Sequence, residues 1–386
     1  MLELRPTCEN CNKPLPPEAL DARICSYECT FCASCVEGVL ENVCPNCGGG
    51  FAPRPVRPAR DLKGGNFLGK DPASTKVRHR PVDPAAHARF AAAIRDIPPH
   101  RRWARAMVDE RAIAAHYATG DLLARLDEAL RADGVDPGHP AVESLAPYDQ
   151  LHGRGIEATE EIAGMMAAGP GDHLLDVGSG LGGPARWIAQ RFGCRVTGID
   201  LTPEFVDVAR ELTRRAGLDD RVRFEAGNAL AMPFAGGSFD GAWSMNVSMN
   251  IADKAALYRE IGRVLKPGGW LVLSELAKGA GGAPDYPTPW ARTAEASFLA
   301  TSDETERGLA AAGFDVVRVE STVGKHLEFA ARSRAIVERG GKPPHRAVLL
   351  LHGEIARQAI ANTSRALSDG RLVPIEVLAR KRNAPD

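Results

Sequence analysis

A glycine cluster behind an apolar run could bind a nucleotide-like cofactor. Residues 172–183 read Asp-His-Leu-Leu-Asp-Val-Gly-Ser-Gly-Leu-Gly-Gly, and a helical pattern begins at Pro184. Glycine lets the chain turn sharply and lets a ligand approach the backbone, and a helix start offers unpaired N–H groups. Asp200 ends the next apolar strand, where its carboxylate can accept hydrogen bonds from ribose hydroxyls. This stretch therefore predicts a cofactor site on a doubly wound α/β sheet.

The spacing of the glycines alone leaves the cofactor open. Gly178, Gly180 and Gly183 satisfy the dinucleotide pattern G-x-G-x-x-G, which is weak when it stands alone. Asp176 and Gly182 extend the pattern to Asp-x-Gly-x-Gly-x-Gly. A carboxylate at position 176 can face a ligand's ammonium group, which favours S-adenosylmethionine (SAM) over NAD.

Eight of the nine cysteines lie within the first 47 residues, in four closely spaced pairs: Cys8 and Cys11, Cys25 and Cys29, Cys32 and Cys35, Cys44 and Cys47. Two such pairs can close one tetrahedral zinc site, so eight thiolates predict two zinc ions. A module this short buries too little apolar surface to fold alone, and metal would supply the missing free energy. A disulfide scaffold and an iron–sulfur cluster are the alternatives. Cys194 is expected to be a small buried residue.

Length and composition narrow the classes of protein. A chain of 386 residues predicts two domains, or one domain and a module. The net charge of −1 offers no ground for a polyanion partner, so nucleic acid is not expected. We see no apolar run near 20 residues and no signal-peptide core, which predicts a cytoplasmic protein without a membrane span. Residues 51–81 are rich in Pro, Gly and basic residues and are expected to form a solvated, extended linker.

The elements that would position these residues alternate between strands and helices. Apolar runs predict strands at 195–200, 221–226, 238–246, 271–275, 315–323 and 375–381. Helices are expected at 101–116, 156–168 and 303–312, with a long helical insert at 326–368. Gly120-Asp121 is expected to cap a helix that carries Leu122, Leu123 and Leu126 on one face.

From about Ala114 to its end, the chain resembles class I SAM-dependent methyltransferases of the small-molecule type. The glycine motif carries this resemblance, together with the turn Lys266-Pro-Gly-Gly before a strand. It implies a seven-stranded Rossmann-like sheet with an antiparallel last strand, and methyl transfer from SAM to an N or O nucleophile of a small molecule. Inserts such as residues 279–301, with Tyr286, Trp290 and Phe298, commonly wall the acceptor pocket in this family.

The sarcosine and phosphoethanolamine methyltransferase-like group has a segment similar to residues 148–155, which folds over the cofactor. The resemblance implies that Tyr148 and Gln150 contact the methionine part. Tyr148 and His152 are the candidate catalytic residues, because a histidine near neutral pKa can serve as general base. An equally simple interpretation is that His152 only orders this segment. The full set of predicted cofactor contacts is Tyr148, Gln150, Asp176, Gly178, Ser179, Gly180, Gly182, Asp200, Leu201, Asn228, Ala229, Ser244 and Asn246.

The order of the cysteine pairs resembles a RING-type cross-brace, and the segment is also similar to a small bacterial cysteine-rich domain of unknown function. The cross-brace implies that the first and third pairs share one zinc ion and the second and fourth share the other; pairing of neighbours remains open. We expect a cysteine-rich module at residues 1–57, a linker with a helical approach at 58–113, and a methyltransferase domain at 114–386. The module could be structural or could contact a protein partner.

Two other functions stay open from the sequence. Asn228 stands where the family commonly has Asp, and Asn250 stands where the phosphoethanolamine-type enzymes carry a histidine. These departures motivate the alternative of a SAM-binding sensor without turnover. An NAD-dependent oxidoreductase is the second alternative.

Overall fold

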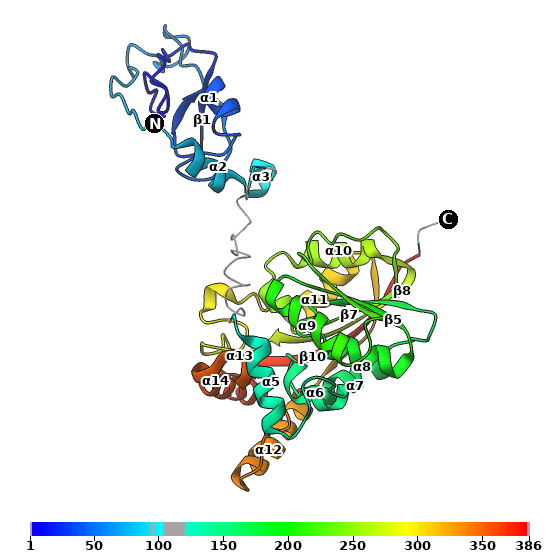
Figure 1. Ribbon diagram of the computed structural model, residues 1–386. Coiled ribbons are helices and arrows are strands. Elements are labelled where there is room, and N and C mark those ends of the chain that lie inside the picture. Colours follow the sequence, from blue (N-terminus) through cyan, green and yellow to red (C-terminus); the bar gives the residue numbers. More distant parts are fainter. Residues whose placement is uncertain (1, 93, 96, 103–119, 384–386) are drawn as a thin grey trace. The chain divides into compact units, whose positions relative to one another are not determined.

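The computed structural model describes residues 2–92, 94–95, 97–102 and 120–383, and the chain divides into two compact units, Met1–Ala106 and Met107–Asp386 (Figure 1). We call them the cysteine unit and the sheet unit. The helix expected at 101–116 lies almost wholly outside the described residues. Among the residues described, no helix is long and apolar enough to cross a membrane.

The sheet unit is built on seven strands in the order β6-β5-β4-β7-β8-β10-β9. They are β4 (His173–Val177), β5 (Arg195–Asp200), β6 (Val222–Ala226), β7 (Phe239–Met245), β8 (Leu265–Lys278), β9 (Phe314–Ser321) and β10 (Leu372–Lys381). The strands β4 to β8 pair in parallel, while β10 runs antiparallel between β8 and β9. The expected Rossmann-like sheet with a reversed last strand is confirmed.

Helices bury both faces of this sheet, which explains why its strands read as nearly continuous apolar runs. On one face, Leu174 and Trp243 pack with α7 (Ile156–Met165), α8 (Gly183–Phe192) and α9 (Pro203–Arg215). On the other face, Leu175 and Val177 pack with α10 (Lys254–Val264) and α11 (Ser302–Ala311). Because successive strand residues point to opposite faces, each strand supplies both cores.

The helices α5 (Leu122–Ala132), α6 (Val142–Asp149) and α7 precede the first strand of the sheet. The apolar face of α5 consists of Leu122, Leu126 and Leu130, which are fully buried against α9. Asp121 is the N-cap residue, as predicted, although its side chain does not cap the helix. Asp121 forms an ion pair with Arg125 (2.9 Å) and makes no capping hydrogen bond from its side chain.

The Lys266-Pro-Gly-Gly segment forms a bulge within β8. Phe239 pairs with Leu265 and Gly241 with Trp270, so four residues of β8 stand opposite Asp240 alone. A Cβ at Gly241 would lie 2.1 Å from the Trp270 ring, which explains why the strand needs glycine there. The expected turn before the strand is therefore a kink within it.

The predicted helical insert is present between β9 and β10. It contains α12 (Val323–Glu338), α13 (Ala347–His352) and α14 (Ala356–Ser368). Short 3-10 turns lie at Ser248–Asn250, Ala294–Ala296 and Gly353–Ile355.

The cysteine unit has little regular structure. It contains β1 (Ala22–Ile24), β2 (Thr30–Cys32), β3 (Ala52–Pro53), α1 (Ala33–Gly38), α2 (Pro84–Ala92) and α3 (Pro99–Arg102). The three strands pair antiparallel in the order β2-β1-β3. Six of the eleven buried residues in its core cluster are cysteines, so this core forms without a long apolar run.

The segment 51–81, expected to be a solvated, extended linker, is largely exposed but makes hydrogen bonds to the first residues of the cysteine unit. Arg57 donates to the carbonyl of Leu2 (2.9 Å), and the backbone N–H of Val82 donates to the side chain of Asn10 (2.8 Å). Arg54 is buried and donates to three backbone carbonyls, those of Arg5, Leu15 and Pro16. Two basic side chains of the segment, Arg54 and Arg57, thus bind backbone carbonyl groups.

Candidate cofactor site and candidate metal centre

The glycine turn joins β4 to α8 and is closely packed on three sides. Gly178, Gly180 and Gly182 all adopt a positive φ, at 76°, 52° and 76°. A Cβ on these residues would lie 2.3 Å from a methyl group of Val247, 2.8 Å from Leu151 and 2.4 Å from Phe224, respectively. Conformation and space both require glycine here, as expected for a backbone that a ligand approaches.

Two acidic side chains flank this turn. Asp200 accepts hydrogen bonds from the N–H groups of Gly180 (2.8 Å) and Thr202 (2.9 Å). Asp176 is 2% exposed, and within the described part of the chain its Oδ2 atom has no hydrogen-bond partner. Burial, and then the neighbouring charge of Asp200, raise the pKa of Asp176 well above its usual range. A buried carboxylate without a partner calls for a cation, and the ammonium group of SAM would supply one.

Other predicted cofactor contacts lie at the same carboxyl edge of the sheet. Ser179 and Ser244 are buried, and no described group bonds to either hydroxyl. Asn246 follows β7 directly and adopts a φ of 55°. Asn228 follows β6, and its Oδ1 atom accepts from the N–H of Leu230 (2.8 Å). The half-buried Leu201 and Ala229 follow Asp200 and Asn228 in the chain. Their contacts with a cofactor stay predictions.

The segment 148–155 covers the glycine turn. A Cβ on Gly183 would lie 2.5 Å from the carbonyl oxygen of Asp149. Asp149 forms a fully buried ion pair with Arg186 of α8 (2.8 Å). Gln150 is also buried; it donates to Asp149 (3.1 Å) and accepts from the Thr159 hydroxyl (2.7 Å). These bonds fix the segment on the turn, and they occupy the Gln150 side chain that was expected to contact methionine.

Tyr148 is engaged elsewhere. Its hydroxyl donates to Asp133 (2.7 Å), at the end of α5, and the Arg346 guanidinium lies over its ring at 4.6 Å. Burial raises the pKa of the Tyr148 hydroxyl. These contacts hold α5, α6 and the helical insert together and do not join the hydroxyl to Asp176 or Asp200. Both predicted roles of Tyr148, cofactor contact and catalysis, stay without support from its hydrogen bonds.

His152 is enclosed by the segment it belongs to. Its Nε2 atom lies 3.2 Å from Gln150 Oε1 and 3.1 Å from the Thr159 hydroxyl, and its Nδ1 atom lies 3.1 Å from the Gly153 carbonyl. Burial lowers the pKa of His152 to about 3. Such a histidine is neutral at pH 7 and accepts a proton poorly. The contacts favour the ordering role, and general-base catalysis by His152 stays a prediction.

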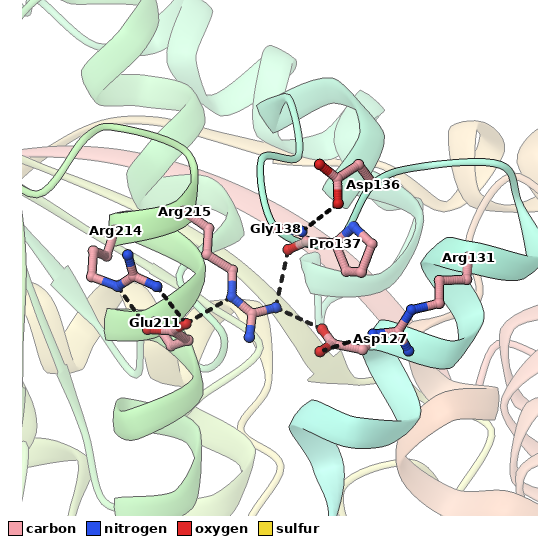
Figure 2. Close-up of a pocket in the computed structure, with 8 residues that line it drawn as sticks. All are labelled: Asp127, Arg131, Asp136, Pro137, Gly138, Glu211, Arg214 and Arg215. Carbon is pink, nitrogen blue, oxygen red and sulfur yellow. Dashed lines mark hydrogen bonds and ion pairs between the residues drawn. The ribbon is translucent and has the colours of Figure 1, made fainter.

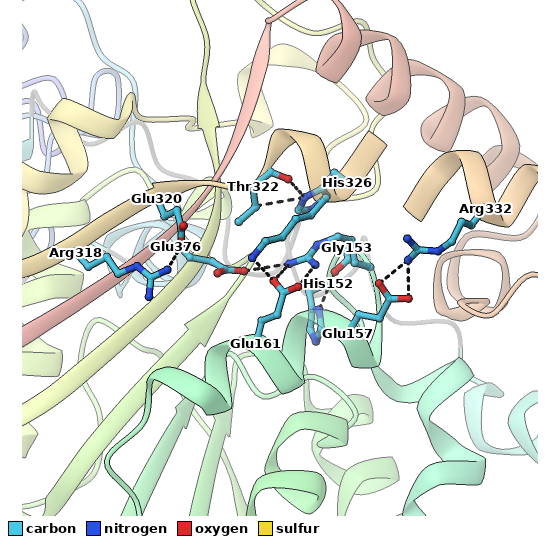
Figure 3. Close-up of polar contacts among 12 residues, drawn as sticks. His152, Gly153, Glu157, Glu161, Arg318, Glu320, Thr322, His326, Arg332 and Glu376 are labelled. Atoms are coloured by element: carbon cyan, nitrogen blue, oxygen red, sulfur yellow. Dashed lines mark hydrogen bonds and ion pairs between the residues drawn. The ribbon is translucent and has the colours of Figure 1, made fainter. Parts of the chain in front are cut away.

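A polar cluster that the sequence did not reveal ties the segment to the helical insert (Figure 3). Arg154 is 3% exposed, adopts a φ of 64°, and forms ion pairs with Glu161 (2.7 Å) and with Glu376 of β10 (3.1 Å). From α12, His326 lies so close that a Cβ on Gly153 would be 2.9 Å from its Nε2 atom. His345 lies 2.7 Å from the Gln150 carbonyl. No spacing in the sequence links positions 154 and 376.

The three buried histidines of this cluster predict a contribution to stability that is lost in acid. Burial lowers the pKa values of His152 (to about 3), His326 (to about 4) and His345, whereas the unfolded chain titrates near 6.5. Between pH 6.5 and 5 these three sites bind more protons in the unfolded state, so their contribution to the free energy of unfolding falls as the pH falls, by up to about 1.4 kcal/mol per pH unit for each histidine. Urea unfolding over this range measures the slope. In His326→Gln the number of protons taken up on unfolding should drop by about one, which changes the slope accordingly. An unchanged slope would contradict the assignment.

A surface hollow of about 470 Å³ lies away from these residues (Figure 2). Its charged side chains pair with one another: Arg215 with Asp127 (2.7 Å) and Arg214 with Glu211 (2.8 Å). Asp127 belongs to α5, and the other three end α9, whose 13 residues span about 20 Å from its start near Asp200. Because its charges are satisfied internally, we assign the hollow no part in the site.

The aromatic residues of the insert 279–301 contribute to an apolar wall. Trp290 is buried with Met249, Leu276 and Leu372, and Tyr286 packs against the same cluster. Met249 follows β7, so this wall stands beside the carboxyl end of that strand. The position suits the expected acceptor pocket.

Seven of the eight N-terminal cysteines gather in two groups. Cys8, Cys11, Cys32 and Cys35 place their sulfur atoms within 4.8 Å of one another, and so do Cys25, Cys44 and Cys47. Cys29 stands outside the second group, although burial and the neighbouring Cys25 thiol raise its pKa to about 11. The N–H of Tyr27 donates to the sulfur of Cys25 (3.3 Å). The first and third pairs come together as the cross-brace implied, whereas of the second pair only Cys25 joins the fourth pair.

Family models match both units of the chain. Residues 1–57 match the family described as "Protein of unknown function (DUF1272)", and residues 175–273 match the family described as "Methyltransferase domain". An uncharacterized protein of Rhizobium meliloti, R02474, is 57% identical over 75 residues, which are 19% of this chain and 82% of that protein.

Two named methyltransferases are similar to the sheet unit. The O-methyltransferase cnsE of Penicillium expansum is 30% identical over 225 residues, which cover 50% of this chain and 79% of that enzyme. Methyltransferase GfsG of Streptomyces halstedii is 35% identical over 161 residues, 41% of this chain and 57% of that protein. The chain thus spans little more than half the length of GfsG.

Solved structures share the fold. The [4+2]-cyclase SpnF superimposes with a TM-score of 0.52 at 23% identity, over 71% of this chain and 97% of that one. The geranyl diphosphate C-methyltransferase of Streptomyces coelicolor, crystallised with S-adenosyl-L-homocysteine, gives a TM-score of 0.52 at 22% identity, over 72% and 98%. At these identities the likeness establishes the fold alone.

Proposed function

The chain belongs to the family of SAM-dependent methyltransferases, and on that basis we propose that it transfers a methyl group from SAM to a nitrogen or oxygen nucleophile of a small molecule. The observation that carries this proposal is the buried Oδ2 atom of Asp176, which has no hydrogen-bond partner among the described residues and lies beside a turn of positive-φ glycines. Bound SAM supplies a methyl group on a sulfonium, which is a good leaving group. The protein's task is then to orient the acceptor in line with that methyl group and to exclude water.

Each part of SAM has a partner in this proposal. Asp176 would bind the ammonium group, and Asp200 would bind the ribose hydroxyls with the acceptor capacity left after its two backbone bonds. Asn228 would accept a bond from the adenine amino group. The segment 148–155, pinned by the Asp149–Arg186 pair, would shield the cofactor from water.

The acceptor would lie beyond the end of β7, between the apolar wall around Trp290 and the polar residues Ser244 and Asn246. An apolar wall beside a few polar groups is the usual make-up of a small-molecule site. We therefore propose an acceptor with both an apolar part and a nucleophilic heteroatom.

Purified full-length protein, incubated with methyl-labelled SAM and a bacterial metabolite extract, tests the proposal. We expect label in a low-molecular-weight product, and calorimetry should show binding of S-adenosylhomocysteine. Binding without transfer to any acceptor would favour a SAM sensor instead. Binding of NADH with no affinity for S-adenosylhomocysteine would overturn the proposal.

For the cysteine unit we propose two bound zinc ions with a structural or protein-contact role. Support comes from the two sulfur groups: the four thiols of the first suit a closed tetrahedral site, and Cys29 would complete the three thiols of the second. Zinc would take the place that apolar residues fill in a larger domain.

A further inference from the structure

The turn that follows β7, residues 246–251, touches the glycine turn directly. Val247 supplies the methyl group that a Cβ on Gly178 would meet at 2.3 Å. Asn246 holds a φ of 55°, which a non-glycine residue adopts at a cost, while its N–H donates to the Ser274 carbonyl (2.8 Å). Something outside the turn must stabilise this conformation.

One support comes from β8. Glu275 is 4% exposed, and its carboxylate accepts from the backbone N–H of Ser248 at 3.2 Å through either oxygen. Its Oε1 atom also lies 3.4 Å from the N–H of Val247. A charged acceptor on consecutive backbone donors fixes the start of the turn more firmly than a neutral one.

The opposite support comes from α10. The Lys254 ammonium donates to the carbonyls of Ser248 (2.8 Å) and Ile251 (2.9 Å), and to that of Phe298 in the insert (2.5 Å). Three acceptors use all three of its N–H groups. Glu275 therefore binds backbone N–H groups of the turn, and Lys254 binds backbone carbonyl groups of the turn.

The two side chains also form a charge pair across the turn. Burial raises the pKa of Glu275 to about 7 and lowers that of Lys254 to about 8, and each charge favours the ionised form of the other. Glu304 of α11 adds a further favourable charge for Lys254, and Tyr258 of α10 feels the charge of Glu275. Buried charges of this kind persist where backbone groups satisfy them.

We propose that Glu275 and Lys254 are positioning residues that hold the turn 246–251 so that Asn246 and Val247 face the cofactor. They act through the turn, because their polar atoms bond to its backbone. This inference rests on the proposed function, since it takes the glycine turn to be the cofactor site. It assigns a role in cofactor binding to two residues that no motif of the sequence marked.

Calorimetric titration of the full-length protein with S-adenosylhomocysteine tests this role. Glu275→Gln keeps the size of the side chain but loses the charge, and we expect about tenfold weaker binding. Lys254→Met should weaken binding similarly, whereas Lys266→Met, which removes a lysine that pairs with Asp240, should not change it. Hydrogen exchange of the Val247 and Ser248 amides should accelerate in Glu275→Gln.

A double-mutant cycle separates positioning from general destabilisation. Asn246→Gly keeps the positive φ accessible but removes the amide, so Glu275→Gln should cost less than twofold in that background. In the Asn228→Ala background, away from the turn, it should again cost about tenfold. Equal losses in both backgrounds, or unchanged affinity in Glu275→Gln, would overturn the inference alone. Failure of the unsubstituted protein to bind S-adenosylhomocysteine would overturn the proposed function and this inference with it.

Discussion

Asp176→Asn is expected to weaken SAM binding by about 100-fold or more. The substitution keeps the shape of the side chain but removes the charge opposite the ligand's ammonium group. Breaking a buried ion pair by removing one partner costs about 3–5 kcal/mol, and every 1.4 kcal/mol is tenfold in affinity. Calorimetric titration with SAM measures the loss.

The same substitution should not destabilise the ligand-free protein. Asp176 is 2% exposed, and within the described residues its Oδ2 atom has no partner that asparagine would lose. An uncompensated buried carboxylate is itself unfavourable, so the thermal midpoint without SAM should stay the same or rise. A lower affinity together with a lower midpoint would point to misfolding rather than to a lost ligand contact.

Asp172→Asn is the matched control. Asp172 precedes the same strand at its other end, where its carboxylate accepts from the N–H of Gly169 (2.8 Å). Its affinity for SAM should equal that of the unsubstituted protein. If Asp176→Asn also binds SAM normally, the assignment of the ammonium site is wrong.

The sheet and the glycine turn were predictable because their signals are local. A run such as Leu174-Leu175-Asp176-Val177 followed by Gly178 specifies a buried strand and a turn within a few residues. The reversed β10 followed from the family resemblance and is confirmed. The expected turn at Lys266 was wrong in form because a bulge depends on pairing with Phe239 and Gly241.

The supports of the site were not predictable because they join distant parts of the chain. Arg154 meets Glu376 across 222 positions, and the partners of Glu275 become visible only when β8 lies beside the turn after β7. Tyr148 shows the converse: the motif marks it as a ligand contact, whereas its hydroxyl bonds to Asp133. The basic segment 51–81 was predicted from its composition to be a solvated linker. Composition alone does not reveal that a side chain such as Arg54 donates to backbone carbonyl groups.

Removal of metal is expected to unfold the cysteine unit and to leave the sheet unit folded. The cysteine unit has strands of three residues or fewer, and cysteines form much of its core, so it has little to fold around without metal. Structural zinc contributes about 10–16 kcal/mol in small zinc-binding peptides at pH 7. After treatment with a chelator, hydrogen exchange should rise throughout residues 2–82, whereas β4 and β5 should stay protected.

The zinc content of variants with one cysteine substituted in either sulfur group tests the two metal sites separately. The unsubstituted protein should hold about two zinc ions per chain. Cys32→Ser, in the first sulfur group, and Cys44→Ser, in the second, should each reduce this to about one. Cys194→Ser is the control, because this buried cysteine belongs to the core beneath α8 and lies in neither sulfur group, so it should leave the zinc content unchanged. Zinc-free protein with a protected cysteine unit would contradict the proposal, because it would show that the thiols and the apolar residues around them fold without a cation.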